Sequence, residues 1–253
     1  MKLAVITPWS SPFMFTCYVD AMLNLERPDG YDVRFFRGTG WCPARRHIDG
    51  CEQALEWGAE LLLITGADQI HPPDMLVKLT GRWEEGYEVV SALVPCRGYV
   101  HWQPMMPFQP MAWRFKSASG KVGEVDTRQR EYRGMDLDFD MVHVINPADG
   151  DIQPVNFIGS GVLMFHRDHL LALEKPWFRE TIHWEDMKRT ANMDCTFVWR
   201  LQREAYARAW VDTTIKVKHA HVFGIDETFS SRFADWAIGG GEREICPDKK
   251  PGE

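Results

Sequence analysis

The chain has 253 residues, of which 45% are hydrophobic and 26% are charged, as in ordinary globular proteins and unlike disordered ones. Its formal net charge of -7 disfavours a general nucleic-acid-binding role, because such proteins neutralise phosphates with clustered Lys and Arg. No stretch approaches the roughly 20 apolar residues of a membrane span, and the short apolar run at the amino terminus stops at Pro8 without a signal-peptide pattern. The expected location is therefore the cytoplasm.

Predicted strands and helices alternate in the first part of the chain. Short apolar runs predict strands at residues 2–7, 32–37, 61–64 and 88–94. Apolar residues at helical spacing predict helices at 12–25 and 44–58, and Pro72 and Pro73 suit the first turn of another helix. Strands that alternate with helices form βαβ units, so we expect an α/β fold with a mainly parallel central sheet.

An irregular insertion, residues 95–152, separates this part from the rest of the chain. It is rich in proline at first and polar afterwards, and only 111–115 and 141–145 are typical of edge strands. Beyond it we expect a strand pair within 153–166, helices at 167–174 and 194–207, and strands at 209–211 and 215–217. We therefore predict a single domain over residues 1–238 and a flexible tail over residues 239–253.

The stretch from Leu61 to Asp74, LLLITGADQIHPPD, carries the clearest functional signal. Four apolar residues followed by a polar turn predict a buried central strand with Asp68 just past its carboxyl end. Ligands of open α/β sheets bind at that end, so Asp68 is a candidate functional residue. The alternative is that Asp68 only forms the turn, where Asp is common.

Five short motifs follow one another along the chain. They are Ala44-Arg45-Arg46, Gly66-Ala67-Asp68, FIGSGVLMF at 157–165, Asn192-Met193-Asp194 and a closing run at 211–219 that ends in His219. In this order they resemble the A-R-N motif, the D-x-D motif, the acceptor-side strand, the x-E-D motif and the closing strands of GT-A fold glycosyltransferases, particularly the small bacterial and phage relatives of family 2. The resemblance covers roughly residues 1–221 apart from the insertion. It implies a single GT-A, Rossmann-like domain and a hexosyltransferase-type enzyme that uses a nucleotide-diphosphate sugar.

The resemblance also implies a donor site with a divalent cation, which would stabilise the charge on the leaving diphosphate. Asp68 and His219 would hold Mn²⁺ or Mg²⁺, since carboxylate oxygens suit both ions and Mn²⁺ also accepts imidazole. His221 is the alternative imidazole ligand, because residues two apart on a strand share a face. The expected donor-binding residues are Pro8, Arg45, Asp68 and Gln69.

On the acceptor side, the resemblance makes Asp194 the base that removes the proton from the acceptor hydroxyl. The alternative is that Asp194 only caps a helix. The expected acceptor-side residues are Trp102, Gly159, Ser160 and Gly161, with Trp102 as a ring on which a sugar stacks. The acceptor is expected to be an envelope glycan or a phage-type modified DNA base, and inversion and retention are both open.

Two acidic residues of the family pattern are replaced in this chain. Gly66 stands at the first position of D-x-D, where Gln69 or His71 is a candidate to compensate, and Met193 stands at the first acidic position of x-E-D. These replacements keep open a second interpretation, in which the protein binds a nucleotide sugar without catalysis. A nucleotidyltransferase is a third interpretation, but residues 7–11 lack the Gly-rich phosphate loop expected of one.

Overall fold

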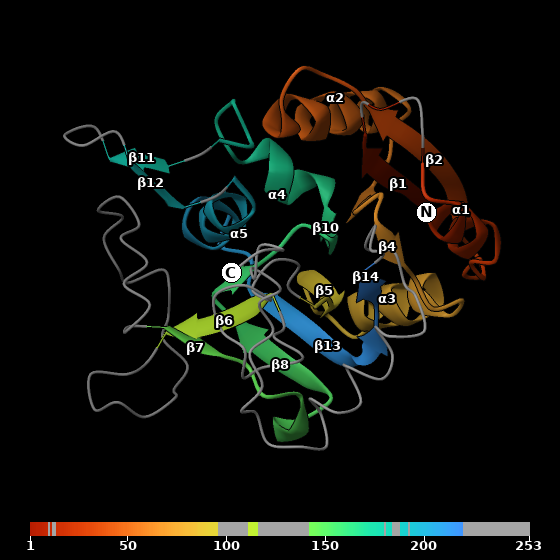
Figure 1. Cartoon of the computed structure of the whole chain (residues 1–253). Coiled ribbons are helices and arrows are strands. Elements are labelled where there is room, and N and C mark those ends of the chain that lie inside the picture. The colour runs from red at the N-terminus through yellow and green to blue at the C-terminus, as the bar shows by residue number, and fades with distance from the viewer. Residues whose placement is uncertain are drawn as a thin grey trace, which may run out of the picture.

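The centre of this computed structural model is a seven-stranded sheet with helices on both faces (Figure 1). The structure describes residues 1–9, 11, 14–95, 111–115, 142–179, 181–183, 188–191 and 193–219. The helices are α1 (Thr16–Leu23), α2 (Pro43–Glu56), α3 (Met75–Glu84), α4 (Arg167–Leu171) and α5 (Met193–Glu204), with a 3-10 helix at Pro147–Asp149. The strands are β1 (Lys2–Pro8), β2 (Asp32–Gly38), β3 (Leu61–Thr65), β4 (Gln69–Ile70), β5 (Val89–Leu93), β6 (Ala112–Phe115), β7 (Val142–Val144), β8 (Ile152–Val155), β9 (Phe157–Ile158), β10 (Val162–His166), β11 (Thr181–His183), β12 (Lys188–Ala191), β13 (Ala209–Lys216) and β14 (Lys218–His219).

The strand order of the central sheet is β2-β1-β3-β10-β5-β13-β8. β1 is parallel to β2 and β3, and β13 is parallel to β5. β10 lies antiparallel between β3 and β5, and β8 is antiparallel to β13 at the edge. The expected α/β fold with a mainly parallel central sheet is therefore confirmed, with β10 and β8 as its reversed strands.

Several predicted elements differ in detail from the structure. The helices expected at 12–25, 167–174 and 194–207 are shorter and span Thr16–Leu23, Arg167–Leu171 and Met193–Glu204. The helix expected to start with the proline pair begins instead at Met75, because Pro73 keeps the residue before it out of the helical region. The two short strands expected at 209–211 and 215–217 are one strand, β13, interrupted by a bulge after Asp212.

Each face of the sheet has its own apolar core, because alternate side chains of a strand point to opposite faces. On one face, side chains of β1 and β3 pack against α2 and α5. The residues are Ala4, Ile6, Leu62 and Ile64 of the strands, Cys51 and Ala54 of α2, and Phe197 and Leu201 of α5. On the other face, Leu3, Val5, Leu61 and Leu63 pack with Met75, Leu76 and Leu79 of α3. Figure 1 shows the resulting three layers, with α2, α4 and α5 on one side and α3 on the other.

Helix α2 approaches the sheet closely because two glycines face each other at the contact. A Cβ on Gly38, at the end of β2, would lie 1.9 Å from the carbonyl oxygen of Arg46. A Cβ on Gly50 would lie 2.3 Å from Ile6 Cγ2 of β1. Both distances are far shorter than any real contact, so only glycine lets the first turns of α2 lie against the ends of β1 and β2.

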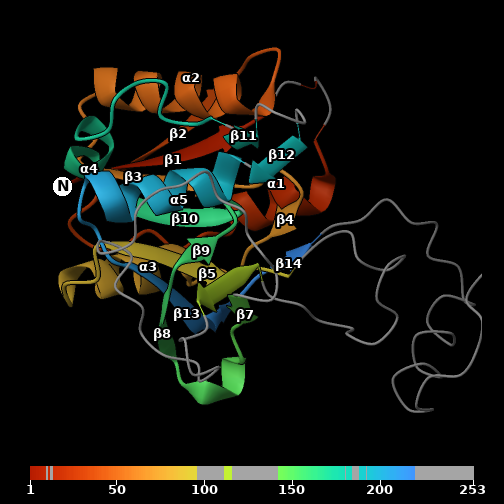
Figure 2. The ribbon, with the colours of Figure 1, turned by 90° about the vertical axis from the view of Figure 1, so that its left-hand side faces the viewer.

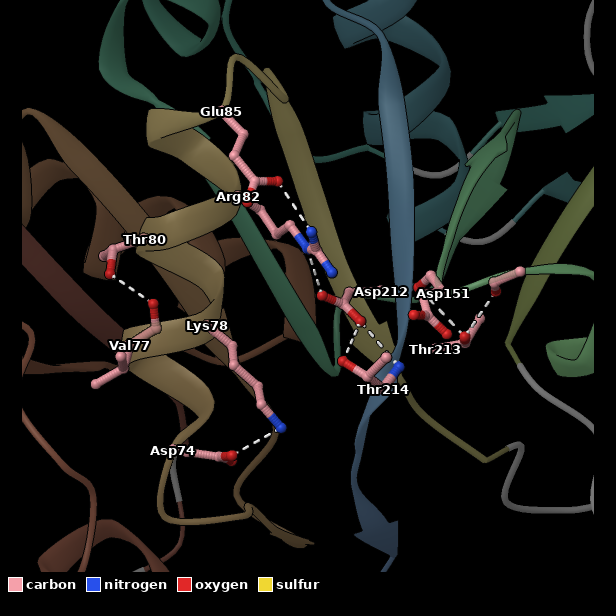
Figure 3. A network of polar contacts seen from close by, with 11 residues as sticks. Asp74, Val77, Lys78, Thr80, Arg82, Glu85, Asp151, Asp212, Thr213 and Thr214 are labelled. Atoms are coloured by element: carbon pink, nitrogen blue, oxygen red, sulfur yellow. Dashed lines mark hydrogen bonds and ion pairs between the residues drawn. The ribbon is translucent and has the colours of Figure 1, made fainter.

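A polar network fixes the bulge of β13 (Figure 3). Asp212 is fully buried, and its Oδ2 accepts a 2.7 Å hydrogen bond from Arg82 Nε on α3. Its Oδ1 accepts hydrogen bonds from the backbone N–H and the hydroxyl of Thr214, at 2.8 and 2.6 Å. The hydrogen bond to Asp212 is also the main reason why the pKa of Arg82 is raised. Because β13 pairs with β5 again at Lys216, the network sets the path of the residues that lead to β14.

We expect Thr214→Val to lower the free energy of unfolding by about 1.5–3 kcal/mol, the usual contribution of a hydrogen bond to a charged group. The matched control is Thr39→Val, because the Thr39 hydroxyl also donates to a carboxylate, Asp49 Oδ2 at 3.1 Å, but in an exposed setting where water replaces the lost bond. Urea unfolding of the two variants measures the difference. Equal losses of stability in the two variants would contradict the claim that the hydrogen bonds of Asp212 stabilise the bulge of β13.

The described part of the expected insertion contributes strands to a separate sheet. β6 and β7 confirm the edge strands expected at 111–115 and 141–145, and they form a three-stranded sheet in the order β7-β6-β9. Trp102, His221 and the expected tail at 239–253 lie outside the described residues.

None of the described helices combines the length and the apolar character needed to cross a bilayer.

Candidate functional site

The carboxyl ends of the parallel strands meet at one edge of the sheet. Pro8 of β1 lies opposite Gly38 of β2, and the hydroxyls of Thr7 and Thr65 are 3.1 Å apart across β1 and β3. Because β10 is antiparallel, it begins at this same edge, with Val162 opposite Thr65. The turns after β1, β2 and β3 and the turn before β10 therefore converge where α/β sheets usually bind ligands.

Asp68 and His219 lie together at this edge. The two-residue strands β4 and β14 pair in antiparallel fashion with Gln69 opposite His219, and Figures 1 and 2 both show them side by side. His219 Nε2 lies 3.6 Å from Asp68 Oδ1. The structure thus brings together the two residues that the sequence resemblance implied as cation ligands.

The orientation of the His219 ring is set by its second nitrogen. His219 Nδ1 lies 2.7 Å from the carbonyl oxygen of Pro95. A carbonyl only accepts hydrogen bonds, so Nδ1 carries the proton and, in the neutral ring, Nε2 presents a lone pair toward Asp68. Histidines that bind metals commonly donate their other N–H to a carbonyl in this manner.

The Asp68–His219 pair fits a divalent cation. A lone pair and a carboxylate oxygen that face each other repel, and a shared cation between them removes the repulsion. The side chains are 19% and 14% exposed, so an ion would be reachable from solvent. Among the described residues no three His, Cys, Asp or Glu side chains gather to hold a metal, so such an ion would take its other ligands from different groups, such as diphosphate oxygens or an amide.

An acidic side chain at position 66, as in the family pattern, would meet the Gln69 amide. A Cβ at position 66 would lie 2.9 Å from Gln69 Nε2 and 3.1 Å from Asp68 Oδ1. The Gln69 side chain, 2% exposed, occupies this space. The replacement of the first D-x-D acid by glycine is therefore coupled to the way Gln69 packs.

The glycine turn that was expected on the acceptor side touches the Gly66 turn directly. The backbone N–H of Gly66 donates a 2.7 Å hydrogen bond to the carbonyl oxygen of Gly161. Gly159 faces away from it, since a Cβ there would meet Met111 at 2.7 Å. The structure therefore places Gly161 next to the expected donor-binding residues, one residue from Ser160.

Ser160 connects this turn to a buried histidine of α2. His47 Nε2 lies 3.2 Å from Ser160 Oγ, and His47 Nδ1 lies 2.8 Å from the carbonyl oxygen of Pro43. The Nδ1 proton therefore donates to Pro43, and the Ser160 hydroxyl donates to Nε2. Asp194, in the first turn of α5, lies close enough for its charge to act on His47. Its Oδ1 is buried and has no hydrogen-bond partner in the described part of the chain.

Burial is the largest influence on the charge state of His47. It lowers the pKa of His47 below the usual value, and the Asp194 carboxylate opposes this effect by raising it. No pattern in the sequence singles out His47, because its contact with Ser160 joins residues 113 positions apart. The structure adds His47 to the residues that surround Asp194.

Arg45 points along α2 in the structure. Its Nη2 lies 3.3 Å from Glu52 Oε2, with both side chains well exposed. Exposed ion pairs contribute little to stability, so a phosphate could displace Glu52 at small cost. The expected donor-binding role of Arg45 stays a prediction.

His71 is a buried imidazole close to Asp68. It is 3% exposed, and both of its ring nitrogens lack a hydrogen-bond partner within the described ranges. Burial lowers the pKa of His71 to about 4, although the Asp68 charge raises it. A buried imidazole without hydrogen bonds lowers the free energy of unfolding. Residues of this kind are typical of functional sites.

We expect His71→Phe to flatten the acid dependence of stability. The unfolded chain binds a proton at this residue below pH ~6.5, whereas the folded chain does so only near pH 4. The free energy of unfolding of the wild type therefore falls as pH drops through this window, and His71 accounts for about 3 kcal/mol of the full loss. Phe removes this part and should leave stability at pH 7 equal or higher, because no unpaired polar group is buried. Urea unfolding at pH 7.5, 6 and 5 tests this, and parallel pH curves for variant and wild type would refute it.

No family model matches the chain, and no curated protein matches it significantly.

Comparison with solved structures identifies similar folds. A197 from STIV has a TM-score of 0.51 and 15% identity, over 87% of this chain and 85% of that chain. Residues 1–349 of S. aureus TarS in complex with UDP-GlcNAc have a TM-score of 0.45 and 12% identity, over 88% of this chain and 60% of that chain. Apo UDP-glucose pyrophosphorylase has a TM-score of 0.41 and 9% identity, over 84% and 90%. The two scores below 0.5 are too low to support a conclusion, and the likeness to A197 concerns the fold alone. The chain thus has the single-domain, GT-A-like α/β fold that its sequence predicts.

Proposed function

We propose that this protein is a glycosyltransferase that uses a divalent cation to move a sugar from a nucleotide-diphosphate donor to an acceptor hydroxyl. The observation that carries the proposal is the Asp68–His219 pair, 3.6 Å apart at the carboxyl edge of the sheet, with His219 Nδ1 bonded to Pro95. A carboxylate and an oriented imidazole at this edge suit an ion that binds a diphosphate.

Asp68 and His219 would hold Mn²⁺ or Mg²⁺. Gln69 pairs with His219, and Pro8 ends β1 at the same edge of the sheet, so both would contribute to the donor site. When bound, the cation neutralises negative charge on the departing diphosphate. Asp68 contributes one negative charge and His219 none, so the loaded site keeps a net positive charge toward the phosphates.

Asp194 would accept the proton of the acceptor hydroxyl. Its Oδ1 has no hydrogen-bond partner in the described ranges, so this oxygen is not committed to another donor. The charge of Asp194 acts on His47, and the ring of His47 is held by its hydrogen bonds with Ser160 and Pro43. With Asp194 as the base, the reaction would be an inverting one. Its acceptor would be a glycan or a modified DNA base.

Incubation with a panel of nucleotide sugars and Mn²⁺, scored for release of nucleoside diphosphate, tests the proposal. We expect release with at least one donor, and loss of that release when EDTA removes the cation. Absence of both donor binding and release across the panel would refute the proposal.

A non-catalytic nucleotide-sugar-binding protein is the second candidate. Gly66 and Met193 replace two acidic residues of the family pattern, and this favours it. Calorimetry distinguishes the candidates, because a binding protein would take up a donor with Mn²⁺ but release no nucleoside diphosphate over hours of incubation with acceptors.

A further inference from the structure

The amide of Gln69 is a buried and incompletely hydrogen-bonded group at the candidate site. Gln69 is 2% exposed, and its Oε1 has no hydrogen-bond partner within the described residues. A buried amide oxygen without a hydrogen bond lowers stability. Its backbone pairs with His219, and Asp68 precedes it in the chain, so Gln69 is a direct neighbour of both expected ligands of the cation.

Two glycines make the space that the Gln69 amide fills. A Cβ on Gly161 would lie 2.0 Å from Gln69 Nε2 and 3.1 Å from its Oε1. A Cβ on Gly66 would lie 2.9 Å from Nε2 and 3.1 Å from Asp68 Oδ1. The nitrogen end of the Gln69 amide and the Asp68 carboxylate thus lie near one point, the place where the side chain of residue 66 would start. A half-turn about the last side-chain torsion of Gln69 exchanges Nε2 and Oε1 and brings the amide oxygen to this point.

Within the described ranges, no ionisable side chain is placed to serve as a third protein ligand of the cation. No third His, Cys, Asp or Glu lies with Asp68 and His219 so as to hold an ion, and this leaves out His71, although the Asp68 charge reaches it. An amide oxygen is a normal ligand for hard divalent cations. Gln69 supplies one that is buried, unpaired and adjacent.

We propose that Gln69 Oε1 is the third protein ligand of the cation held by Asp68 and His219, in place of the acidic residue that Gly66 lacks. The inference rests on the proposed function for the presence of the cation. A ligand set of one carboxylate, one imidazole and one neutral amide carries one negative charge less than a set with two carboxylates. Since imidazole suits Mn²⁺ better than Mg²⁺, the site binds Mn²⁺ more tightly than Mg²⁺.

Titration of the folded protein with Mn²⁺ alone, followed by the electron paramagnetic resonance signal of free Mn²⁺, tests the inference without a donor or an acceptor. Gln69→Met keeps the length of the side chain and removes the oxygen, and we expect its Mn²⁺ affinity to fall about 10-fold or more. Gln202→Met is the matched control. Gln202 is also a buried glutamine, but its amide donates to the carbonyl oxygens of Asn156 and Val198, so its loss should lower stability and leave Mn²⁺ affinity unchanged.

A double-mutant cycle tests whether Gln69 and residue 66 compete for one place. Gly66→Asp introduces the family acid, but its Cβ meets the Gln69 amide. In a Gln69→Ala background that obstacle is gone, so Gly66→Asp should improve Mn²⁺ affinity by about 10-fold more there than in the wild type. An equal effect in both backgrounds would overturn the proposed replacement.

The outcomes separate this inference from the proposed function. If Gln69→Met binds Mn²⁺ as the wild type does while Asp68→Asn and His219→Gln do not bind it, Gln69 is not a ligand and the cation site stands. If the wild type does not bind Mn²⁺, or none of the three variants alters its affinity, the cation site itself is wrong and both proposals fail. Circular dichroism of each variant shows that it is folded before the titration.

Discussion

Asp68→Asn should reduce cation-dependent release of nucleoside diphosphate by a factor on the order of 10²–10³, the usual loss when one stabiliser of developing charge is removed. Asparagine has nearly the same shape as aspartate, so the turn at Gly66 should remain folded. It carries no charge, and the pair with His219 Nε2 at 3.6 Å then offers a cation only neutral ligands. Initial rates with the best donor of the panel, measured across a range of Mn²⁺ concentrations, give the factor.

Asp74→Asn is the control for this experiment. Asp74 lies in the same stretch of chain but forms an exposed ion pair with Lys78, at 2.7 Å. Its replacement should change the rate less than about 2-fold, since exposed pairs contribute little. A similar loss in both variants, or an unchanged rate in Asp68→Asn, would be inconsistent with Asp68 as a cation ligand.

Arg200→Met should lower the free energy of unfolding by about 3–5 kcal/mol, the range found when one partner of a buried charged network is removed. Arg200 is 1% exposed, and all of its guanidinium nitrogens donate hydrogen bonds. Nε and Nη2 donate to the Glu204 carboxylate, while Nη1 and Nη2 also donate to the carbonyl oxygens of Glu174, Pro176 and Trp177. The side chain thus ties α5 to the segment before it, and methionine would leave all these acceptors without their donor.

Arg167→Met is the control for Arg200, because the Arg167 side chain is 42% exposed and pairs with Asp168 only at 3.6 Å. It should cost less than about 1 kcal/mol. Arg200→Lys should fall between the two, since an ammonium cannot match the planar fork of a guanidinium. Urea unfolding gives the three values, and similar stability of Arg200→Met and Arg167→Met would show that the network does not hold α5 in place.

The strands of the first part of the chain could be predicted because each has a local cause. β1, β3 and β5 are short apolar runs bounded by turn residues, and such runs are typical of buried parallel strands. Asp68 follows β3 directly, so its place at the carboxyl edge follows from the strand alone. His219 was located only by the resemblance of the closing run to known glycosyltransferases.

The details of the site could not be predicted, because they depend on contacts between distant residues. Nothing local in a two-residue strand specifies that β14 pairs with β4, and the ring of His219 is oriented by Pro95, 124 residues away. The same holds for the pairing of His47 with Ser160. The sequence shows Gly66 as a missing acid with Gln69 or His71 as a candidate to compensate, and only the structure shows that the Gln69 amide lies where the side chain of residue 66 would start.

The most direct test of the central claim is calorimetric titration of the protein with UDP, GDP, ADP and dTDP, each with Mn²⁺ and again with EDTA, in the wild type and in Asp68→Asn and His219→Gln. If the edge that carries Asp68 and His219 is a cation-dependent diphosphate site, at least one nucleotide binds with Mn²⁺, and this binding is lost with EDTA and in both variants. Failure of every nucleotide to bind, or binding that survives EDTA and both substitutions, would contradict the claim.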